Sequence, residues 1–357
     1  MSRGLAVRLG VWSALLQAAR LGINALVFLV LARVLPLAEV GAFSVAFAIA
    51  QLAQSLVRAG VLETVIAAER HDDAYLSAAH AVVIACGAAS SALLVLAGAI
   101  LWWLNADART GLFLLALAVL PLSDAWGVVP DAVMRRALRF RALAIRTTLA
   151  LTAAGAAALA AGFAGFGAWA LAAFSVAGSV LSSALALAMC GRRIPLRWGP
   201  EAREIAQPAA RLALSALATA SILPVSQVAV GAIAGHAAAG AYAIAQRLVG
   251  LLTAMTVEPA RSVALPFLSR VTADEETRRR AVIQGLGLMI TIMTPLYFGL
   301  YATAPVALPL LLGENGARSA PVVAALCWQY VPLAISVIVA QLLLAVRQPR
   351  EVLVFTS

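Results

Sequence analysis

The stretch VWSALLQAARLGINALVFLVLA, residues 11–32, decides the class of this protein, because it is apolar over a length that crosses a bilayer. Four polar side chains interrupt it at helical spacing, Ser13, Gln17, Arg20 and Asn24. Their steps of four, three and four residues put all of them on one face of a helix. An arginine in the membrane interior is costly unless it faces other helices or water. The stripe therefore predicts a bundle interior or a water-filled pathway, and favours a protein that handles a polar or anionic substrate.

The composition of the whole chain predicts an all-α, polytopic membrane protein. Of its 357 residues, 63% are hydrophobic and 12% are charged, whereas soluble domains are about 25% charged. The apolar stretches are long and continuous rather than alternating, which excludes an outer-membrane barrel. The net charge is +10, but the basic residues are all arginines in short clusters between apolar segments. This distribution argues against a nucleic-acid partner and for the lipid bilayer as the surroundings of the chain.

Ten apolar segments are predicted to be membrane spans, each about one bilayer thickness or a little more. They cover residues 11–32, 40–62, 77–103, 112–133, 145–163, 166–190, 206–233, 238–262, 281–310 and 319–346. The basic N-terminus before the first segment resembles a signal peptide. The apolar run is too long for one, however, and it contains Arg20, so we expect it to be retained as the first span.

The arginines alternate between the two sides of the predicted spans. Connecting segments on one side hold all but five of the 26 basic residues. Of those five, Arg33, Arg109 and Arg318 lie on the other side, and Arg20 and Arg247 lie within spans. Because cytoplasmic loops are enriched in arginine, we predict an inner-membrane protein with a cytoplasmic N-terminus.

The longest polar connection, residues 191–207, divides the chain into two predicted lobes. Residues 1–195 form a six-helix N-terminal bundle, and residues 196–357 form a C-terminal bundle of four helices plus the start of a fifth. A short repeat supports this division, since GAFSVA at residues 41–46 matches GAYAIA at residues 240–245. The repeat pairs the second helix of each lobe in one orientation, as in two-lobed transporters with parallel repeats.

Polar side chains on the first, second and eighth spans are candidates for lining a cavity between the lobes. The candidate substrate-binding residues are Gln17, Arg20, Asn24, Gln51, Arg58, Gln246 and Arg247. The planar guanidinium fork makes bidentate contacts to phosphate, so the set favours an anionic substrate such as a lipid-linked pyrophosphate. Alternative roles remain open for two of these arginines. Arg58 lies near a span end and can snorkel to the membrane interface. Arg247 can pair with an acid on a neighbouring helix.

Asp124 is the acid that lies deep in the fourth predicted span. It is a candidate site for a coupling ion, and the alternative is a structural ion pair with an arginine on another helix. Asp131 lies four residues before Arg135, and we expect these two to pair. The sequence contains no HExxH, CxxC, GxxxxGK[ST] or GxSxG pattern, and its three cysteines do not form a disulfide framework. We therefore expect no catalytic residue, no metal and no cofactor.

Three local patterns, in this order along the chain, resemble those of bacterial polysaccharide flippases of the multidrug/oligosaccharidyl-lipid/polysaccharide exporter superfamily. The first is LARVLP at residues 31–36, followed by EVG at residues 39–41. The second is Pro130 with RRALRF at residues 135–140, and the third is GFGAWAL at residues 165–171.

This resemblance implies two helical bundles in a V around a central cavity, and transport by alternating access. It implies that an undecaprenyl-pyrophosphate-linked oligosaccharide moves to the outer face for O-antigen, capsule or exopolysaccharide synthesis, with polysaccharide polymerases and other assembly proteins as partners. It also implies cavity arginines on spans one, two and eight, which are matched here by Arg20, Arg58 and Arg247. Members of the family usually have twelve or more spans, so we expect this ten-span chain to be a C-terminally truncated member; the alternative is that the missing spans are dispensable.

Two other functions stay open from the sequence. A multidrug exporter of the same superfamily would favour an acid-rich cavity for organic cations, whereas the candidate cavity here is rich in arginine. A membrane polymerase or glycosyltransferase would carry a sizeable outer loop or an acidic metal-binding motif, and the sequence shows neither.

Overall fold

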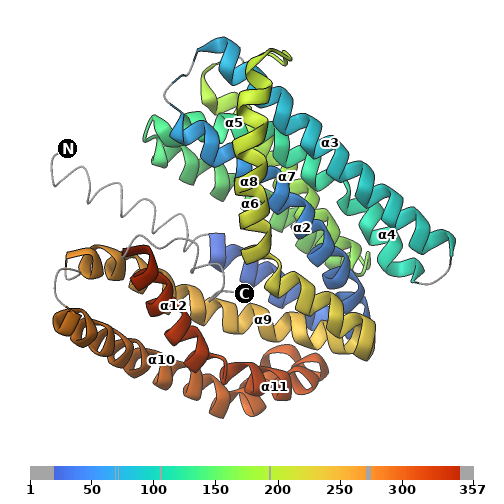
Figure 1. Ribbon diagram of the computed structural model, residues 1–357. Helices are drawn as coiled ribbons and strands as arrows, with labels where there is room; N and C mark the ends of the chain where they lie inside the picture. The colour runs from blue at the N-terminus through green and yellow to red at the C-terminus, as the bar shows by residue number, and fades with distance from the viewer. Residues whose placement is uncertain are drawn as a thin grey trace. The chain divides into compact units, whose positions relative to one another are not determined.

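The computed structural model describes residues 20–68, 70, 72–104, 107–192, 194–270 and 275–345, which form helices and short connections without a strand. Residues 20–34 are helical, and eleven labelled helices follow them (Figure 1). These are α2 (Leu37–Ala67), α3 (Asp73–Trp103), α4 (Ala108–Leu117), α5 (Val119–Arg136), α6 (Phe140–Phe163), α7 (Trp169–Cys190), α8 (Glu201–Ala220), α9 (Ile222–Arg270), α10 (Glu275–Leu312), α11 (Glu314–Cys327) and α12 (Tyr330–Ala345).

The described chain is a multi-pass membrane protein, as predicted. Seven helical segments are long and apolar enough to cross a bilayer, and α11 with the start of α12 adds an eighth if this pair, bent by 41°, is one span. Five of the predicted spans coincide with α2, α3, the α4–α5 pair, α6 and α7. The total of ten spans stays a prediction, and the first nine residues of the first span lie outside the described residues.

The chain reverses its direction within α9, at Gly235, whose φ of 81° and ψ of 174° are not helical. A hydrogen bond joins the two sides of this turn, because the Gln227 side-chain amide donates to the carbonyl oxygen of Ala239 at 2.9 Å. In an unbroken helix, twelve residues would separate these groups by about 18 Å. The reversal therefore separates two helical segments at the place where the sequence predicts the end of one span at residue 233 and the start of the next at residue 238.

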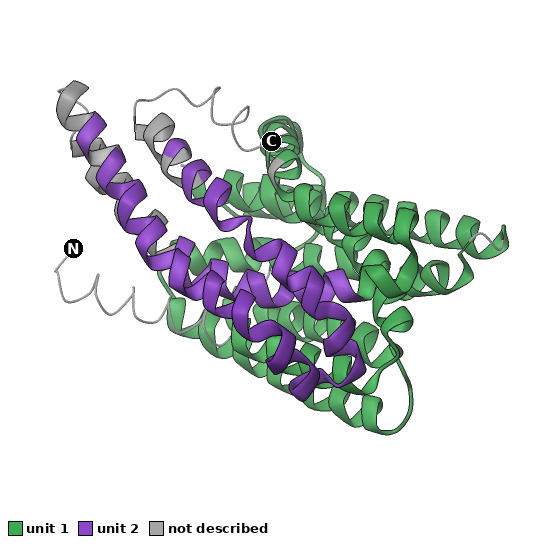
Figure 2. Ribbon diagram, turned by 90° about the horizontal axis from the view of Figure 1, so that it is seen from below, with its two compact units in different colours: residues 1–240 green, residues 241–357 purple. Residues whose placement is uncertain are grey.

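The chain packs as two compact units, Met1–Gly240 and Ala241–Ser357, which Figure 2 shows in different colours. Helix α8 belongs to the first unit, because it packs along α2 and also contacts α3. The predicted division between residues 195 and 196 follows the longest polar connection rather than this packing, and the two predicted lobes stay a prediction.

The two glycines that begin the sequence repeat meet at the Gly235 turn. A Cβ atom on Gly41 of α2 would lie 1.7 Å from the carbonyl oxygen of His236 and 2.8 Å from the amide nitrogen of Gly240. A Cβ atom on Gly240 would lie 2.2 Å from the carbonyl oxygen of Leu37. Neither position has space for a side chain, so the backbones of α2 and α9 touch there, as small residues permit in membrane proteins.

Residues of the three sequence patterns make contacts between helix ends. Glu39, in the first turn of α2, accepts a hydrogen bond of 3.2 Å from the backbone N–H of Ala168 at the start of α7. Arg136 donates to the carbonyl oxygens of Ile66 and Ala68 at the end of α2, at 3.0 and 2.7 Å. A carboxylate near a helix N-terminus and a guanidinium near a C-terminus both complement the helix dipole. These contacts assign a structural role to residues of the patterns.

His236 connects the Gly235 turn to the start of α4. Its Nε2 atom lies 2.8 Å from Oδ2 of Asp107 and 3.3 Å from the hydroxyl of Thr110. Asp107 caps α4, because its Oδ1 accepts a hydrogen bond of 3.1 Å from the Thr110 N–H. Burial opposes the ionisation of Asp107, but the hydrogen bonds from Thr110 and His236 outweigh it and hold the pKa of Asp107 below its ordinary value.

We expect Gly41→Ala to destabilise the first unit by about 3 kcal/mol, because the added methyl group overlaps the backbone of the turn. The measurement is the thermal unfolding midpoint of the purified protein. Gly250→Ala is the matched control, since a Cβ atom on Gly250 would have no neighbouring atom within 4 Å, and alanine is the better helix former. An unfolding midpoint of Gly41→Ala at or above that of the wild type would contradict the close approach.

We expect the stabilising effect of Asp107 to depend on pH. A carboxylate whose pKa is lower in the folded protein contributes stability above its ordinary pKa of about 3.9, and loses that contribution as the pH falls through the folded value. Asp107→Asn should therefore lower the unfolding midpoint at neutral pH, and the difference from the wild type should shrink below about pH 4. A difference that stays constant from neutral to acidic pH would show that the ionised form contributes nothing.

Candidate functional site

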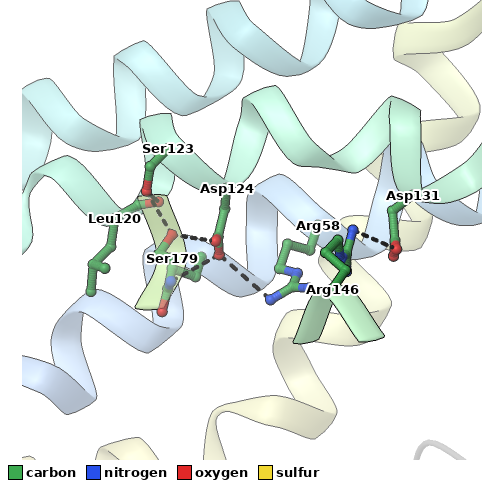
Figure 3. Close-up of polar contacts among 8 residues, drawn as sticks. Arg58, Leu120, Ser123, Asp124, Asp131, Arg146 and Ser179 are labelled. Atoms are coloured by element: carbon green, nitrogen blue, oxygen red, sulfur yellow. Dashed lines mark hydrogen bonds and ion pairs between the residues drawn. The ribbon is translucent and has the colours of Figure 1, made fainter. Parts of the chain in front are cut away.

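A polar network lies among helices of the first unit, centred on Asp124 of α5 (Figure 3). The Asp124 side chain is only 8% exposed. Its Oδ1 accepts a hydrogen bond of 2.6 Å from the hydroxyl of Ser179 on α7, and its Oδ2 accepts one of 2.8 Å from the amide of Gln54 on α2. Nη1 of Arg58, also on α2, lies 3.6 Å from the same Oδ2 atom. The carboxylate thus connects three helices.

The network forms because of spacing within each helix. Gln54 and Arg58 are four residues apart on α2, so both reach the face that meets α5. Asp124 and Asp131 are seven residues apart on α5, which again puts them on one face. Between the predicted alternatives for Asp124, the structure contains the ion pair with an arginine of another helix. A role in ion coupling stays a prediction.

Asp131 is the second buried carboxylate, and it has two arginine partners. Nε of Arg135 lies 2.9 Å from its Oδ2, which confirms the predicted pair within α5. Nη1 of Arg146, on α6, lies 3.1 Å from its Oδ1, and both of these side chains are under a tenth exposed. Sequence reasoning missed Arg146, because it stands at the start of a span among other loop arginines. Asp131 in the preceding span is the signal that could have indicated Arg146, because a buried acid requires a cation from a neighbouring helix.

Arg20 belongs to the same electrostatic neighbourhood, and its predicted role in a cavity stays a prediction. Arg20 is exposed. It interacts electrostatically with Arg58, Asp124, Arg135 and Asp131. Four arginines, with Arg146 as the fourth, accompany two carboxylates, so this set has a surplus of two positive charges. The surplus gives the first unit a cationic site that can bind an anion.

The remaining predicted site residues lie in several places. The Asn24 side chain donates 2.7 Å to the carbonyl oxygen of Arg20, one turn back along the same helix. Gln51 is exposed on α2, one turn before Gln54. Gln246 and Arg247 are half-buried on the part of α9 that belongs to the second unit. Gln17 lies outside the described residues.

The charge and exposure of the arginines suit this arrangement to binding anions. Among the residues that the structure describes, no group of three or more His, Cys, Asp or Glu side chains could hold a metal ion. The Arg58 side chain is 46% exposed and contacts Asp124 without a short hydrogen bond, so part of its guanidinium fork can bind an incoming oxyanion.

We expect Arg146→Met to lower the free energy of unfolding by about 3 kcal/mol, because it leaves one buried side of Asp131 without a cation. Arg141→Met is the control, since Arg141 is exposed on the same helix. Both variants can be compared with the wild type by thermal unfolding. The double variant Asp131→Asn with Arg146→Met should be less damaged than Arg146→Met alone, because it leaves no unpaired charge. Equal or greater damage in the double variant would contradict this account.

Comparisons with known proteins agree with the resemblance predicted from the three sequence patterns. The family described as polysaccharide biosynthesis protein matches residues 30–321. The succinoglycan biosynthesis transport protein ExoT of Rhizobium meliloti (strain 1021) is 24% identical to this chain over 326 residues. That similarity covers 87% of this chain and 63% of ExoT, so the chain spans less than two-thirds of the length of this relative.

Solved structures of two transporters share the fold. The lipid II flippase MurJ, in an inward closed conformation, superposes with a TM-score of 0.72 at 10% identity, over 96% of this chain and 77% of MurJ. The MATE multidrug transporter DinF-BH superposes with a TM-score of 0.53 at 14% identity, over 97% of this chain and 84% of that protein. At these identities the similarity concerns the fold alone.

Proposed function

Because the chain belongs to the polysaccharide biosynthesis protein family, we propose that it carries a lipid-linked oligosaccharide across the bacterial cytoplasmic membrane by alternating access. The substrate we propose is an oligosaccharide on undecaprenyl pyrophosphate. The observation that carries the proposal is the arginine surplus around Asp124 and Asp131, inside a helical membrane unit. A charge within a membrane helix marks a substrate or ion pathway by default.

The chemistry of the substrate matches the side chains available. A pyrophosphate is a compact anion with several oxygens, and arginine binds such groups through two parallel hydrogen bonds. Arg20 and Arg58 of the first unit and Arg247 of the second unit are the proposed phosphate-binding residues. The amide side chains of Gln17, Asn24, Gln51 and Gln246 can donate to and accept from sugar hydroxyls. Asp124 is the proposed coupling group.

The charge of the site separates this proposal from multidrug export. A pathway for organic cations favours a surplus of carboxylates, whereas the two buried carboxylates that the structure describes in the first unit already have arginine partners. The similarity to DinF-BH supports the helical fold and says nothing about its substrate. ExoT and MurJ are named as a transport protein and a flippase, which supports transport rather than an enzymatic reaction.

The proposal is tested by reconstituting the protein in liposomes and following a fluorescent undecaprenyl-pyrophosphate oligosaccharide as it becomes accessible from the opposite leaflet. We expect Arg20→Gln, Arg58→Gln and Arg247→Gln each to reduce the rate at least about tenfold, because each removes a charge-assisted contact to phosphate. Arg141→Gln is the control on an exposed arginine and should keep the wild-type rate. The amount of protein in the membrane is measured for every variant.

Two outcomes would contradict the proposal. Wild-type protein that moves the labelled lipid no faster than protein-free liposomes would exclude flipping by this chain. Loss of the Arg20, Arg58 and Arg247 variants from the membrane, instead of loss of rate, would assign these arginines to the structure rather than to the substrate.

A further inference from the structure

The contact between Arg58 and Asp124 is the loosest of the three arginine contacts to the buried carboxylates. Its closest nitrogen–oxygen distance is 3.6 Å, against 2.9 Å for Arg135 and 3.1 Å for Arg146 on Asp131. The Arg58 side chain is also far more exposed than that of Arg146, at 46% against 7%. A long, half-exposed ion pair contributes little free energy, so an external anion can replace the carboxylate as the partner of Arg58.

Asp124 itself is held firmly, and it does not need Arg58 for its hydrogen bonds. Ser179 and Gln54 each donate one short hydrogen bond to it, from α7 and α2. The carboxylate therefore stays in place when the guanidinium moves. An anion that binds to Arg58 then lies beside a second negative charge, and this repulsion weakens its binding while Asp124 is ionised.

The hydroxyl groups beside Asp124 can also accommodate its protonated form. Oγ of Ser123 lies 2.6 Å from Oγ of Ser179, and either hydroxyl can be the donor. Ser123 also lies 3.0 Å from the carbonyl oxygen of Leu120, to which it donates. When Asp124 is ionised, Ser179 donates to it. When Asp124 is protonated, its new O–H can donate to Ser179, Ser179 to Ser123, and Ser123 to Leu120, so every donor keeps an acceptor (Figure 3).

Other charged groups around Asp124 come from several helices. Arg58 faces it from α2, and Arg20 interacts with it from the helical segment before α2. Asp131 and Arg135 lie further along α5, and Arg146 of α6 interacts with Asp131, Arg58 and Arg135. On α7, the neighbouring polar group is the neutral hydroxyl of Ser179.

We propose that Asp124 is a positioning residue that competes with the substrate pyrophosphate for Arg58 and that yields Arg58 when it takes up a proton from water. The carboxylate gains one proton and becomes a neutral acid, and no other bond forms or breaks. Anion binding and proton uptake are then linked, so each favours the other by the same factor. This inference rests on the proposed function, because it takes Arg58 as a phosphate-binding residue.

The test measures the affinity of the full chain, in lipid nanodiscs, for undecaprenyl pyrophosphate in a series of buffers from acidic to alkaline pH. Undecaprenol, which has no phosphate, is the uncharged reference ligand. Pyrophosphate also titrates in this range, so the informative quantity is the ratio of affinities between a variant and the wild type at each pH. We expect Asp124→Asn to bind about fivefold more tightly than the wild type at the alkaline end, and the two affinities to converge at the acidic end.

Two further variants make the test specific to the competition. In an Arg58→Gln background, Asp124→Asn should bring no gain, because the residue for which it competes is absent. Ser123→Ala removes the acceptor that Ser179 needs when Asp124 is protonated, so it should shift the affinity profile of an otherwise wild-type protein to lower pH. Ser175→Ala is the matched control, since the Ser175 hydroxyl bonds to Leu171 within α7, one turn from Ser179.

The possible outcomes separate this inference from the function on which it rests. If the wild type does not prefer undecaprenyl pyrophosphate to undecaprenol, the proposed function fails. If it does, but the ratio of Asp124→Asn to wild type is the same at every pH, the competition fails and the function stands. A gain in affinity from Asp124→Asn that persists in the Arg58→Gln background would also overturn the competition. The same holds if Ser123→Ala leaves the dependence of the affinity on pH unchanged.

Discussion

Two carboxylates buried on one membrane helix impose the main constraint on the first unit. The hydrocarbon around the helices offers no hydrogen bonds, and Asp124 and Asp131 are buried, so each finds cations and hydrogen-bond donors within the protein. Asp124 finds them on α2 and α7, and Asp131 finds them on α6 and on its own helix α5. The same requirement that aligns these helices also concentrates arginines in one place. Stability and the proposed site for anions therefore arise from the same contacts.

Close backbone contacts determine how α2 meets its other neighbours. At Gly41 and Gly240, and again where Gly60 faces the carbonyl oxygen of Ala209 on α8, a side chain would overlap main-chain atoms. Without a hydrophobic driving force between helices in lipid, such close packing supplies much of the attraction. Gly41 and Gly240, which begin the two copies of the sequence repeat, contact each other. The repeat therefore corresponds to a physical contact in the fold as well as to a similarity in sequence.

Apolar length and helical spacing were sufficient to predict the all-α membrane fold, five of the spans and the reversal near residue 235. Helical spacing also put Arg20 and Arg58 each on the polar face of its own helix, and both interact electrostatically with Asp124. Partners on other helices could not be predicted, because periodicity describes one helix at a time. Ser179 and Arg146 were therefore missed, although both bind the carboxylates directly. The sequence patterns that indicated the family proved to include structural contacts, since Glu39 and Arg136 bind helix ends.

A shared fold does not decide what a transporter carries, since a lipid II flippase and a multidrug transporter both superpose on this chain. The charge balance of the site is more informative, because a surplus of arginine within a membrane-spanning bundle is costly unless an anion lies beside it. Within the protein itself, Asp124 and Asp131 neutralise part of the positive charge of these arginines. One of these carboxylates holds its arginines closely and the other holds Arg58 loosely. In the proposed competition, an acid that stabilises the site also regulates how readily the site binds an anion.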